Sequence, residues 1–181
     1  MNNHSTRRKK RPQAAFLQIL GHMRECYIGV DPGAKGYVVV YNAISKQFGK
    51  YPLSGELLVD FLTTNATFDA ICVIEKVHAM PGQGRSSCFT FGYNTGRVVG
   101  IIEALGIPYT MVTPQTWQRE MWDSGDKVMQ GKKVDNKRTS YYAARRLHPK
   151  MMFTRTERCK TFDDNLVDAT LICDYAIRKN L

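Results

Sequence analysis

The sequence predicts a single α/β domain built on a mixed sheet of about five strands flanked by helices. Short apolar runs of strand length alternate with longer segments of helical periodicity. The first runs follow one another directly, which is typical of an antiparallel meander. The later runs are separated by helices, which implies parallel pairing. A chain of 181 residues is long enough to bury one hydrophobic core.

Five segments have the composition of strands. The first and fourth are fully apolar, and β-branched and aromatic residues fill the second. The predicted strands are 26–30, 36–41, 46–50, 70–74 and 108–112. Because the ends of parallel strands gather at one edge of a sheet, functional side chains are expected at that edge.

Helices fill most of the remaining chain. Ser54 is expected to cap one helix, Ser86 and Ser87 another, and Thr113-Pro114 is typical of a helix start. The predicted helices are 54–64, 88–105, one from Pro114, 135–147 and 164–178, with a polar linker over 124–133.

The composition is that of a basic globular protein. There are 26 lysines and arginines against 16 acidic residues, and the formal net charge is +10. This excess favours nucleic acid or another polyanion as partner. No apolar run approaches the roughly 20 residues that a membrane span needs, so no membrane partner is expected. The five cysteines are odd in number and form no CxxC pair, which favours a reducing compartment.

Residues 1–24 are expected to form a basic, disordered tail ahead of a domain at 25–181. The tail contains Arg7-Arg-Lys-Lys-Arg11, and no acid precedes Glu25. Three interpretations stay open: a DNA-binding arm, a fusion remnant ending at Gly21-His-Met23, and an organellar transit peptide.

Two carboxylates are predicted at strand ends. Asp31 precedes Gly33 and Gly36, where the backbone can turn and let phosphate or metal approach; alternatively, Asp31 satisfies turn amides. Glu75 ends an apolar strand, where a carboxylate is costly unless it is paired or binds metal. An ion pair with Lys76 is the simpler alternative for Glu75.

Asp164 and Asp168 are four residues apart, which places both on one face of a helix. Like charges at this spacing repel, and a divalent ion would remove the penalty. Capping of the helix N-terminus is the alternative, but it would favour Asp163 and Asp164 and leave Asp168 unexplained.

Gly92, Gly96 and Gly100 recur every fourth residue along the long helix, and Ala104 continues the stripe. Each glycine inside a helix costs roughly 1 kcal/mol relative to alanine. The stripe therefore predicts close approach by another backbone, either the protein's own sheet or a partner helix.

Basic residues surround the predicted acids. Along 132–146 the chain is rich in lysine and arginine, with Lys137, Tyr141 and Arg145 on one helical face. A merely solvated helix is the alternative to nucleic-acid binding. The candidate DNA-binding residues are His78, Arg85, Lys132, Lys133, Lys137, Arg138, Arg145 and Lys160.

Four motifs, in this order, resemble the RuvC family of Holliday junction resolvases, and most nearly its compact phage and prophage members. They are Tyr27-Ile-Gly-Val-Asp-Pro-Gly33, Val73-Ile-Glu75, Thr113-Pro-Gln-Thr-Trp117 and Asp164-Asn-Leu-Val-Asp168. The resemblance runs from Cys26 to the C-terminus. It implies an RNase H-like fold and a homodimer formed through the long helix, at Gly92, Gly96 and Gly100.

The resemblance also implies an activity. Four acidic ligands, Asp31, Glu75, Asp164 and Asp168, would hold two Mg²⁺ or Mn²⁺ ions per active site, with Asp163 as the alternative to Asp164. The substrate would be a four-way DNA junction, cut by paired symmetric nicks in recombination and repair. His78 falls where family members carry an aromatic residue that stacks at the junction. No small-molecule cofactor is expected, and the location would be the cytoplasm of a bacterial host or phage-infected cell, or an organelle if the tail is a transit peptide.

Three rival functions share parts of this pattern. An RNase H-type nuclease acting on RNA–DNA hybrids would use the same acids. A junction-binding protein without catalysis would not need all four. An actin-like kinase also carries an Asp-x-Gly loop, but that fold needs two such domains.

Overall fold

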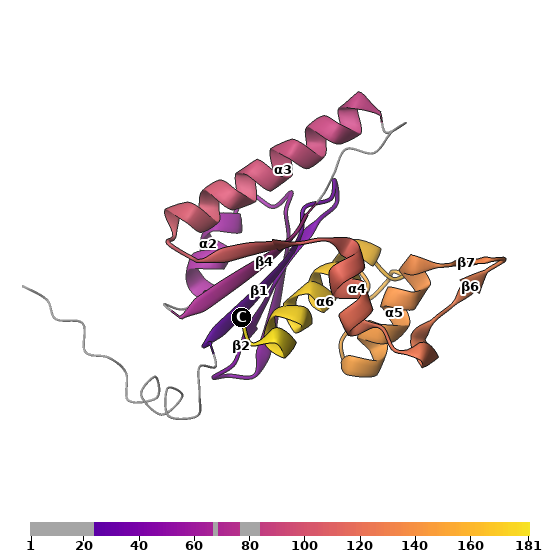
Figure 1. Ribbon diagram of the computed structural model, residues 1–181. Coiled ribbons are helices and arrows are strands. Elements are labelled where there is room, and N and C mark those ends of the chain that lie inside the picture. The colour runs from indigo at the N-terminus through magenta and orange to yellow at the C-terminus, as the bar shows by residue number, and fades with distance from the viewer. Residues whose placement is uncertain (1–23, 67–68, 77–83) are drawn as a thin grey trace, which may run out of the picture.

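The computed structural model describes residues 24–66, 69–76 and 84–181, and its centre is a five-stranded sheet (Figure 1). The order across the sheet is β3-β2-β1-β4-β5. The strands are β1 Cys26–Asp31, β2 Tyr37–Asn42, β3 Gln47–Pro52, β4 Ala70–Glu75 and β5 Tyr109–Val112. The first three form an antiparallel meander, whereas β4 runs parallel to β1 and β5 parallel to β4. The predicted mixed sheet is therefore confirmed.

Helices cover both faces of the sheet (Figure 1). One face carries α2 (Leu58–Asn65) and α3 (Arg85–Ala104), which bury Leu58, Leu62, Val98 and Ile102 against it. The other face carries α4 (Pro114–Met121), α5 (Asn136–Leu147) and α6 (Asp164–Lys179). Alternation along β1 divides its side chains between the two layers, with Ile28 and Val30 toward α2 and α3 and Tyr27 toward α6.

Gly29 of β1 is the point of closest approach between the sheet and α6. A β-carbon at this position would overlap the backbone nitrogen of Cys173 and the carbonyl oxygen of Ala169. The Cys173 thiol also donates a hydrogen bond to the Tyr27 carbonyl oxygen, at 3.3 Å. Only glycine lets α6 lie directly on the central strand.

The helix starts differ from expectation at two places. The helix predicted from Ser54 begins only at Leu58, because the Leu57 amide donates to the Tyr51 hydroxyl at 3.1 Å and Arg97 binds the carbonyl oxygens of Leu53 and Gly55. Side-chain capping of α3 by Ser86 and Ser87 is wrong as well. The helix begins earlier, at Arg85 after Gly84, and its N-cap makes no side-chain hydrogen bond.

The predicted polar linker 124–133 is instead structured. A short 3-10 helix, η1 (Ser124–Asp126), leads into an antiparallel hairpin of β6 (Met129–Gln130) and β7 (Lys133–Val134). The hairpin projects from the body of the molecule beside α5 (Figure 1).

Among the described residues, none of the helices combines the length and apolar character that a membrane span needs. The predicted tail falls almost wholly on residues 1–23, and His78 falls within 77–83, so both lie outside the described residues.

Candidate nuclease site

Asp31 and Glu75 lie next to each other at the ends of the parallel strands β1 and β4. Val30 pairs with Ile74, so the following residues, Asp31 and Glu75, continue the same register. Both fall on the face of the sheet that α6 covers, because alternation from Gly29 and Val73 returns to that face. Asp31 is 7% exposed, and its Oδ1 accepts a hydrogen bond from the Gly33 amide at 2.9 Å.

Glu75 is fixed in place by an aromatic side chain from α4. The indole Nε1 of Trp117 donates to Glu75 Oε1 at 2.9 Å, and the Trp117 side chain is fully buried. The Thr113-Pro114 helix start and the apolar face of α4 together place this indole under the carboxylate. One carboxylate oxygen of Glu75 therefore has a fixed donor.

Helix α6 brings two more carboxylates to the same place. Asp164 is its first residue, and Asp168 follows one turn later on the same face. Asp168 Oδ1 is buried and has no hydrogen-bond partner, while the Ser140 hydroxyl of α5 hydrogen-bonds to the carboxylate. A buried carboxylate oxygen without a donor is costly unless a cation satisfies it.

Three of these carboxyl groups, Asp31, Glu75 and Asp168, have raised pKa values, and burial is the largest cause for each. Burial and the neighbouring Glu75 charge raise the pKa of Asp31 to about 7. Burial and the nearby Asp31 raise the pKa of Asp168 well above its ordinary value. Burial also raises the pKa of Glu75, against the opposing effect of the Trp117 hydrogen bond. The site holds more negative charge than its own donors neutralise.

This donor set fits a divalent cation. Among the described residues, no three Asp, Glu, His or Cys side chains already stand close enough around one point to hold a metal ion. The oxygens are nevertheless those that Mg²⁺ and Mn²⁺ prefer, and a bound cation would neutralise their mutual repulsion and occupy the free Asp168 Oδ1. Asp31, Glu75, Asp164 and Asp168 are the residues that would hold it.

Asp163 is engaged in other contacts. As N-cap of α6 it accepts a hydrogen bond from the Asn165 amide at 3.2 Å, and Arg155 Nε donates to its Oδ2 at 2.9 Å. Burial opposes ionisation, but the hydrogen bonds from Arg155, Asn165 and the Leu166 amide hold the pKa of Asp163 below its ordinary value. Both oxygens of Asp163 have donors, whereas the ion pair that Asp164 makes with Lys137 engages its Oδ2, so Asp164 is the better candidate ligand of the two.

The arrangement of strands and helices in this chain is shared with solved structures. No family model and no curated protein matches the chain. Among solved structures, Thermus thermophilus RuvC in complex with a Holliday junction substrate matches with a TM-score of 0.52 and 10% identity, over 85% of this chain and 96% of the other. A second structure of Thermus thermophilus RuvC matches with the same TM-score and coverage, at 15% identity.

The chain has the RuvC fold. At these identities the likeness establishes the arrangement of strands and helices and does not extend to the activity. The sheet order, with helices on both faces, agrees with the RNase H-like fold expected from the four motifs.

Lys137, on the first turn of α5, forms an ion pair with Asp164 across the site. The hydrogen bond and charge of Asp164 raise the pKa of Lys137 above its ordinary value. Lys137 was predicted only as a DNA-binding residue. In the RuvC fold of this chain it also contacts a candidate metal ligand.

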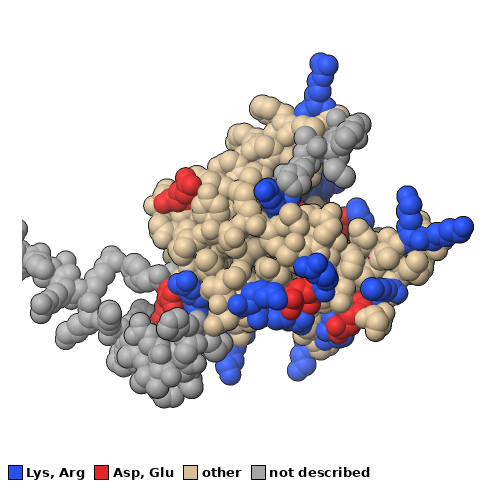
Figure 2. All heavy atoms as spheres, viewed as in Figure 1, with Lys and Arg blue, Asp and Glu red and all other residues tan. Residues whose placement is uncertain are grey.

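Most of the other predicted DNA-binding residues are on the layer of α5 and α6. Arg145 and Lys160 line one pocket of about 450 Å³ with Tyr141, Phe153 and Phe162. Lys132 and Lys133 lie on the hairpin, and Arg138 is exposed on α5. Arg85 is exposed at the first residue of α3, on the opposite layer. Figure 2 shows lysine and arginine side chains projecting from the end of the molecule that carries β6 and β7.

The glycine stripe of α3 faces outward. A β-carbon added at Gly92, Gly96 or Gly100 would meet no atom within 4 Å. Packing of the stripe on the protein's own sheet, one of the two alternatives, is therefore wrong. The exposed side of α3 also carries Phe89 and Tyr93, at 76% and 62% exposure.

Several contacts of the site were not predicted. Trp117 was predicted only as part of a motif and Arg155 only as a basic residue that extends the positive charge toward Asp164, and Ser140 carried no signal of its own. Asn94 of α3 donates from Nδ2 to the Gly33 carbonyl oxygen at 2.8 Å, which ties the turn after Asp31 to the opposite helical layer. Asn94 could have been singled out in the sequence because it is a polar residue on the inner side of an amphipathic helix.

Proposed function

We propose that this protein is a metal-dependent endonuclease that resolves four-way DNA junctions by paired nicks. The observation that carries the proposal is the buried Asp168 Oδ1, which has no hydrogen-bond partner and belongs to a carboxyl group whose pKa is raised by burial and by the nearby Asp31 and Glu75. Burying several carboxylates close together is energetically costly, even in a chain of net charge +10. A bound cation would offset that cost.

The protein's own residues would prepare the site for phosphodiester hydrolysis. Trp117 and the Gly33 amide hold Glu75 and Asp31 in fixed orientations, so neither carboxylate must reorganise. Lys137 brings a positive charge beside Asp164, where a phosphate would approach. Divalent ions bound by Asp31, Glu75, Asp164 and Asp168 would supply an activated water and charge neutralisation at the phosphate.

Branched DNA is the substrate that the remaining features support. The exposed basic residues on α5 and the hairpin offer phosphate contacts, and Lys137 of α5 is ion-paired with the candidate ligand Asp164. The solved RuvC complex with a Holliday junction, which shares the fold, points to the same class of substrate. Symmetric cutting of two strands requires two sites related by a two-fold axis, and we assign the dimer contact to Gly92, Gly96 and Gly100.

The direct test is a comparison of substrates. Purified protein is incubated with a four-way junction, a linear duplex of the same sequence and an RNA–DNA hybrid, each with Mg²⁺ and with EDTA. Cleavage of the junction alone, only with Mg²⁺, is the expected result. Cleavage of the hybrid in preference would establish the RNase H-type alternative, and binding of the junction without cleavage would establish the non-catalytic one.

A further inference from the structure

Hairpin β6–β7 is small and leaves its apolar side chains in solvent. Met129 pairs with Val134 and Gln130 with Lys133, and Gly131 begins the two-residue turn with a φ of +63°. Directly paired residues share a face, so Met129 and Val134 form one apolar face and Gln130 and Lys133 the other. Met129 is 57% exposed and Val134 37%.

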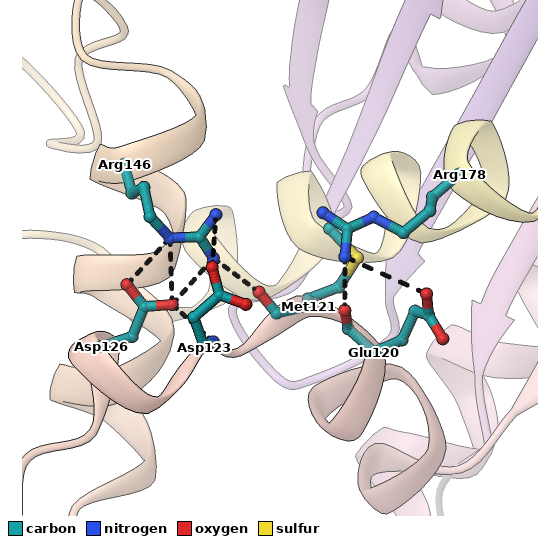
Figure 3. Close-up of polar contacts among 6 residues, drawn as sticks. All are labelled: Glu120, Met121, Asp123, Asp126, Arg146 and Arg178. Atoms are coloured by element: carbon teal, nitrogen blue, oxygen red, sulfur yellow. Dashed lines mark hydrogen bonds and ion pairs between the residues drawn. The ribbon is translucent and has the colours of Figure 1, made fainter.

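The base of this hairpin is firmly anchored although its tip is free. Asp123 and Asp126 form a capping box around η1. Arg146 of α5 binds both Asp126 oxygens, at 3.1 and 2.8 Å, and also the Met121 carbonyl oxygen at 2.9 Å (Figure 3). Beyond η1, the Asp135 amide donates to the Val128 carbonyl oxygen at 2.8 Å, and the Val128 amide donates to Thr139 Oγ1 at 3.1 Å. The hairpin therefore has a fixed direction.

Hairpin β6–β7 is expected to be only marginally stable by itself. Two-stranded hairpins are marginally stable in water, and this one has two residue pairs, with both apolar side chains exposed. Its sequence is also biased in charge: from Lys127 to Val134 there are three lysines and no acid. The exposed face and the charge together indicate a polyanionic partner that also offers apolar surface.

The second strand of the hairpin leads into the first turn of α5, which contacts the candidate nuclease site through Lys137. Val134 is followed three residues later by Lys137, which pairs with Asp164. A DNA strand that reached the carboxylates along α5 would therefore meet the hairpin next. Continuous duplex stacks its base pairs on one another, whereas a branch point exposes the face of a base pair, a surface that suits a small apolar wedge.

We propose that hairpin β6–β7 is a branch-point finger: Lys127, Lys132 and Lys133 bind backbone phosphates while Met129 and Val134 pack on the base pair exposed at the branch. This inference rests on the proposed function, because it names the part of the DNA that the same site would hold. The lysines supply affinity for any duplex. The apolar pair supplies the preference for a junction.

Two double variants separate these contributions, with DNA binding measured in EDTA so that cleavage does not interfere. Met129→Ser with Val134→Ser should weaken junction binding roughly tenfold or more and leave linear duplex binding unchanged. Lys132→Gln with Lys133→Gln should weaken both, and lower the slope of log affinity against log salt by about 2. A junction carrying 2-aminopurine at the branch should change its fluorescence with wild-type protein, but not with the apolar variant.

A shortened protein and a matched surface variant serve as controls. Replacing Met129–Val134 by Asn-Gly closes the hairpin at the Val128–Asp135 pair and keeps the Asp126–Arg146 anchor, so the fold should survive while the junction preference is lost. Ile44→Ser with Lys46→Gln removes the same kinds of side chain from the turn between β2 and β3, at the far end of the sheet, and should bind as wild type does.

The outcomes also separate this inference from the proposed function. Hairpin variants that bind junctions as well as wild type would overturn the finger while leaving a junction nuclease in place. An equal loss on junction and linear duplex for the apolar variant would also overturn it. If wild-type protein itself shows no preference for a junction over a duplex, both proposals fall together.

Discussion

Gly29 on β1 touches the backbone of Cys173 on α6, and this contact sets how closely the Asp168 carboxylate approaches Asp31. A β-carbon at Gly29 would lie only 2.8 Å from Cys173 Cα and would overlap the neighbouring nitrogen. Asp168 lies on the same helix, a little more than one turn before Cys173. The spacing of sheet and helix is thus part of the geometry of the site.

Gly29→Ala should therefore damage both stability and site. Overpacking two backbones costs roughly 3 kcal/mol and would push α6 away from β1. Urea denaturation would measure the loss, and any cleavage activity should fall with it even where the protein is folded. Gly125→Ala is the control, because a β-carbon at Gly125 meets nothing within 4 Å. A Gly29→Ala protein as stable as the control would show that the two layers can separate freely.

The acidic residues should differ in importance. Asp31→Asn, Glu75→Gln and Asp168→Asn should abolish cleavage while leaving junction binding intact or tighter, because each removes negative charge near the phosphates. Asp164→Asn should be nearly as severe. Gel-shift and cleavage assays on one junction would measure both properties.

Asp163→Asn is the matched control for Asp164→Asn. Asparagine caps helices well, so the main loss is the contact with Arg155, and activity should remain within about tenfold of wild type. An inactive Asp163→Asn protein beside an active Asp164→Asn protein would reverse the assignment of the third ligand.

The metal-free protein should become less stable as the pH rises through neutrality. The pKa of Asp31 is raised from 3.8 to about 7, so the folded state holds this proton more tightly than the unfolded chain. Its contribution to stability is greatest below the unfolded value and is lost as pH rises through about 7. Between pH 5.5 and pH 8 the free energy of unfolding should fall by about 1–2 kcal/mol from this group alone.

Urea titrations at the two pH values, in EDTA and in Mg²⁺, would test this dependence. Mg²⁺ should reduce the difference, since a cation replaces the protons. Asp31→Asn should be more stable than wild type at pH 8 in EDTA. A metal-free wild type that is equally stable at both pH values would contradict the crowding of charge at this site.

The predicted fold follows from features that are local in the sequence. Apolar runs ending in Asp31 and Glu75 identify parallel strand ends, and the spacing of Asp164 and Asp168 identifies one face of a helix. The structure brings Glu75, Asp164 and Asp168 within range of the charge of Asp31. The features that were not predicted depend on contacts between residues that are far apart in the sequence. The hairpin has too few residues for a strand pattern and is held by Arg146, twenty residues after Asp126. The late start of α2 depends on Tyr51 and Arg97, which no local pattern reveals.

The basic surface of α5 should govern affinity for all DNA. Arg138→Glu with Arg145→Glu should weaken binding to junction and duplex alike and flatten its salt dependence, because fewer counterions are released. Arg119→Glu with Lys46→Glu makes the same change in net charge at exposed positions outside α5, on α4 and on the turn between β2 and β3. If both double variants lose affinity equally, net charge rather than α5 controls binding.

The outward glycine stripe permits a test of assembly that leaves the fold intact. A side chain at Gly96 has open space in the single chain, so Gly96→Leu should fold with the same circular dichroism spectrum as wild type. If α3 pairs with its copy, the leucine should yield a monomer in sedimentation, able to nick one strand but not two in concert. A Gly96→Leu protein that stays dimeric would move the interface elsewhere.

Helix α3 presents two different sides within the same two turns. Gly92 and Gly96 face solvent, while Asn94 between them holds the carbonyl oxygen of Gly33, two residues from Asp31. A rigid helix cannot shift on one side without shifting on the other. A partner that displaced α3 by docking on the glycine face would therefore also move the turn that orients Asp31, and the Asn94–Gly33 hydrogen bond would carry that movement to the candidate site.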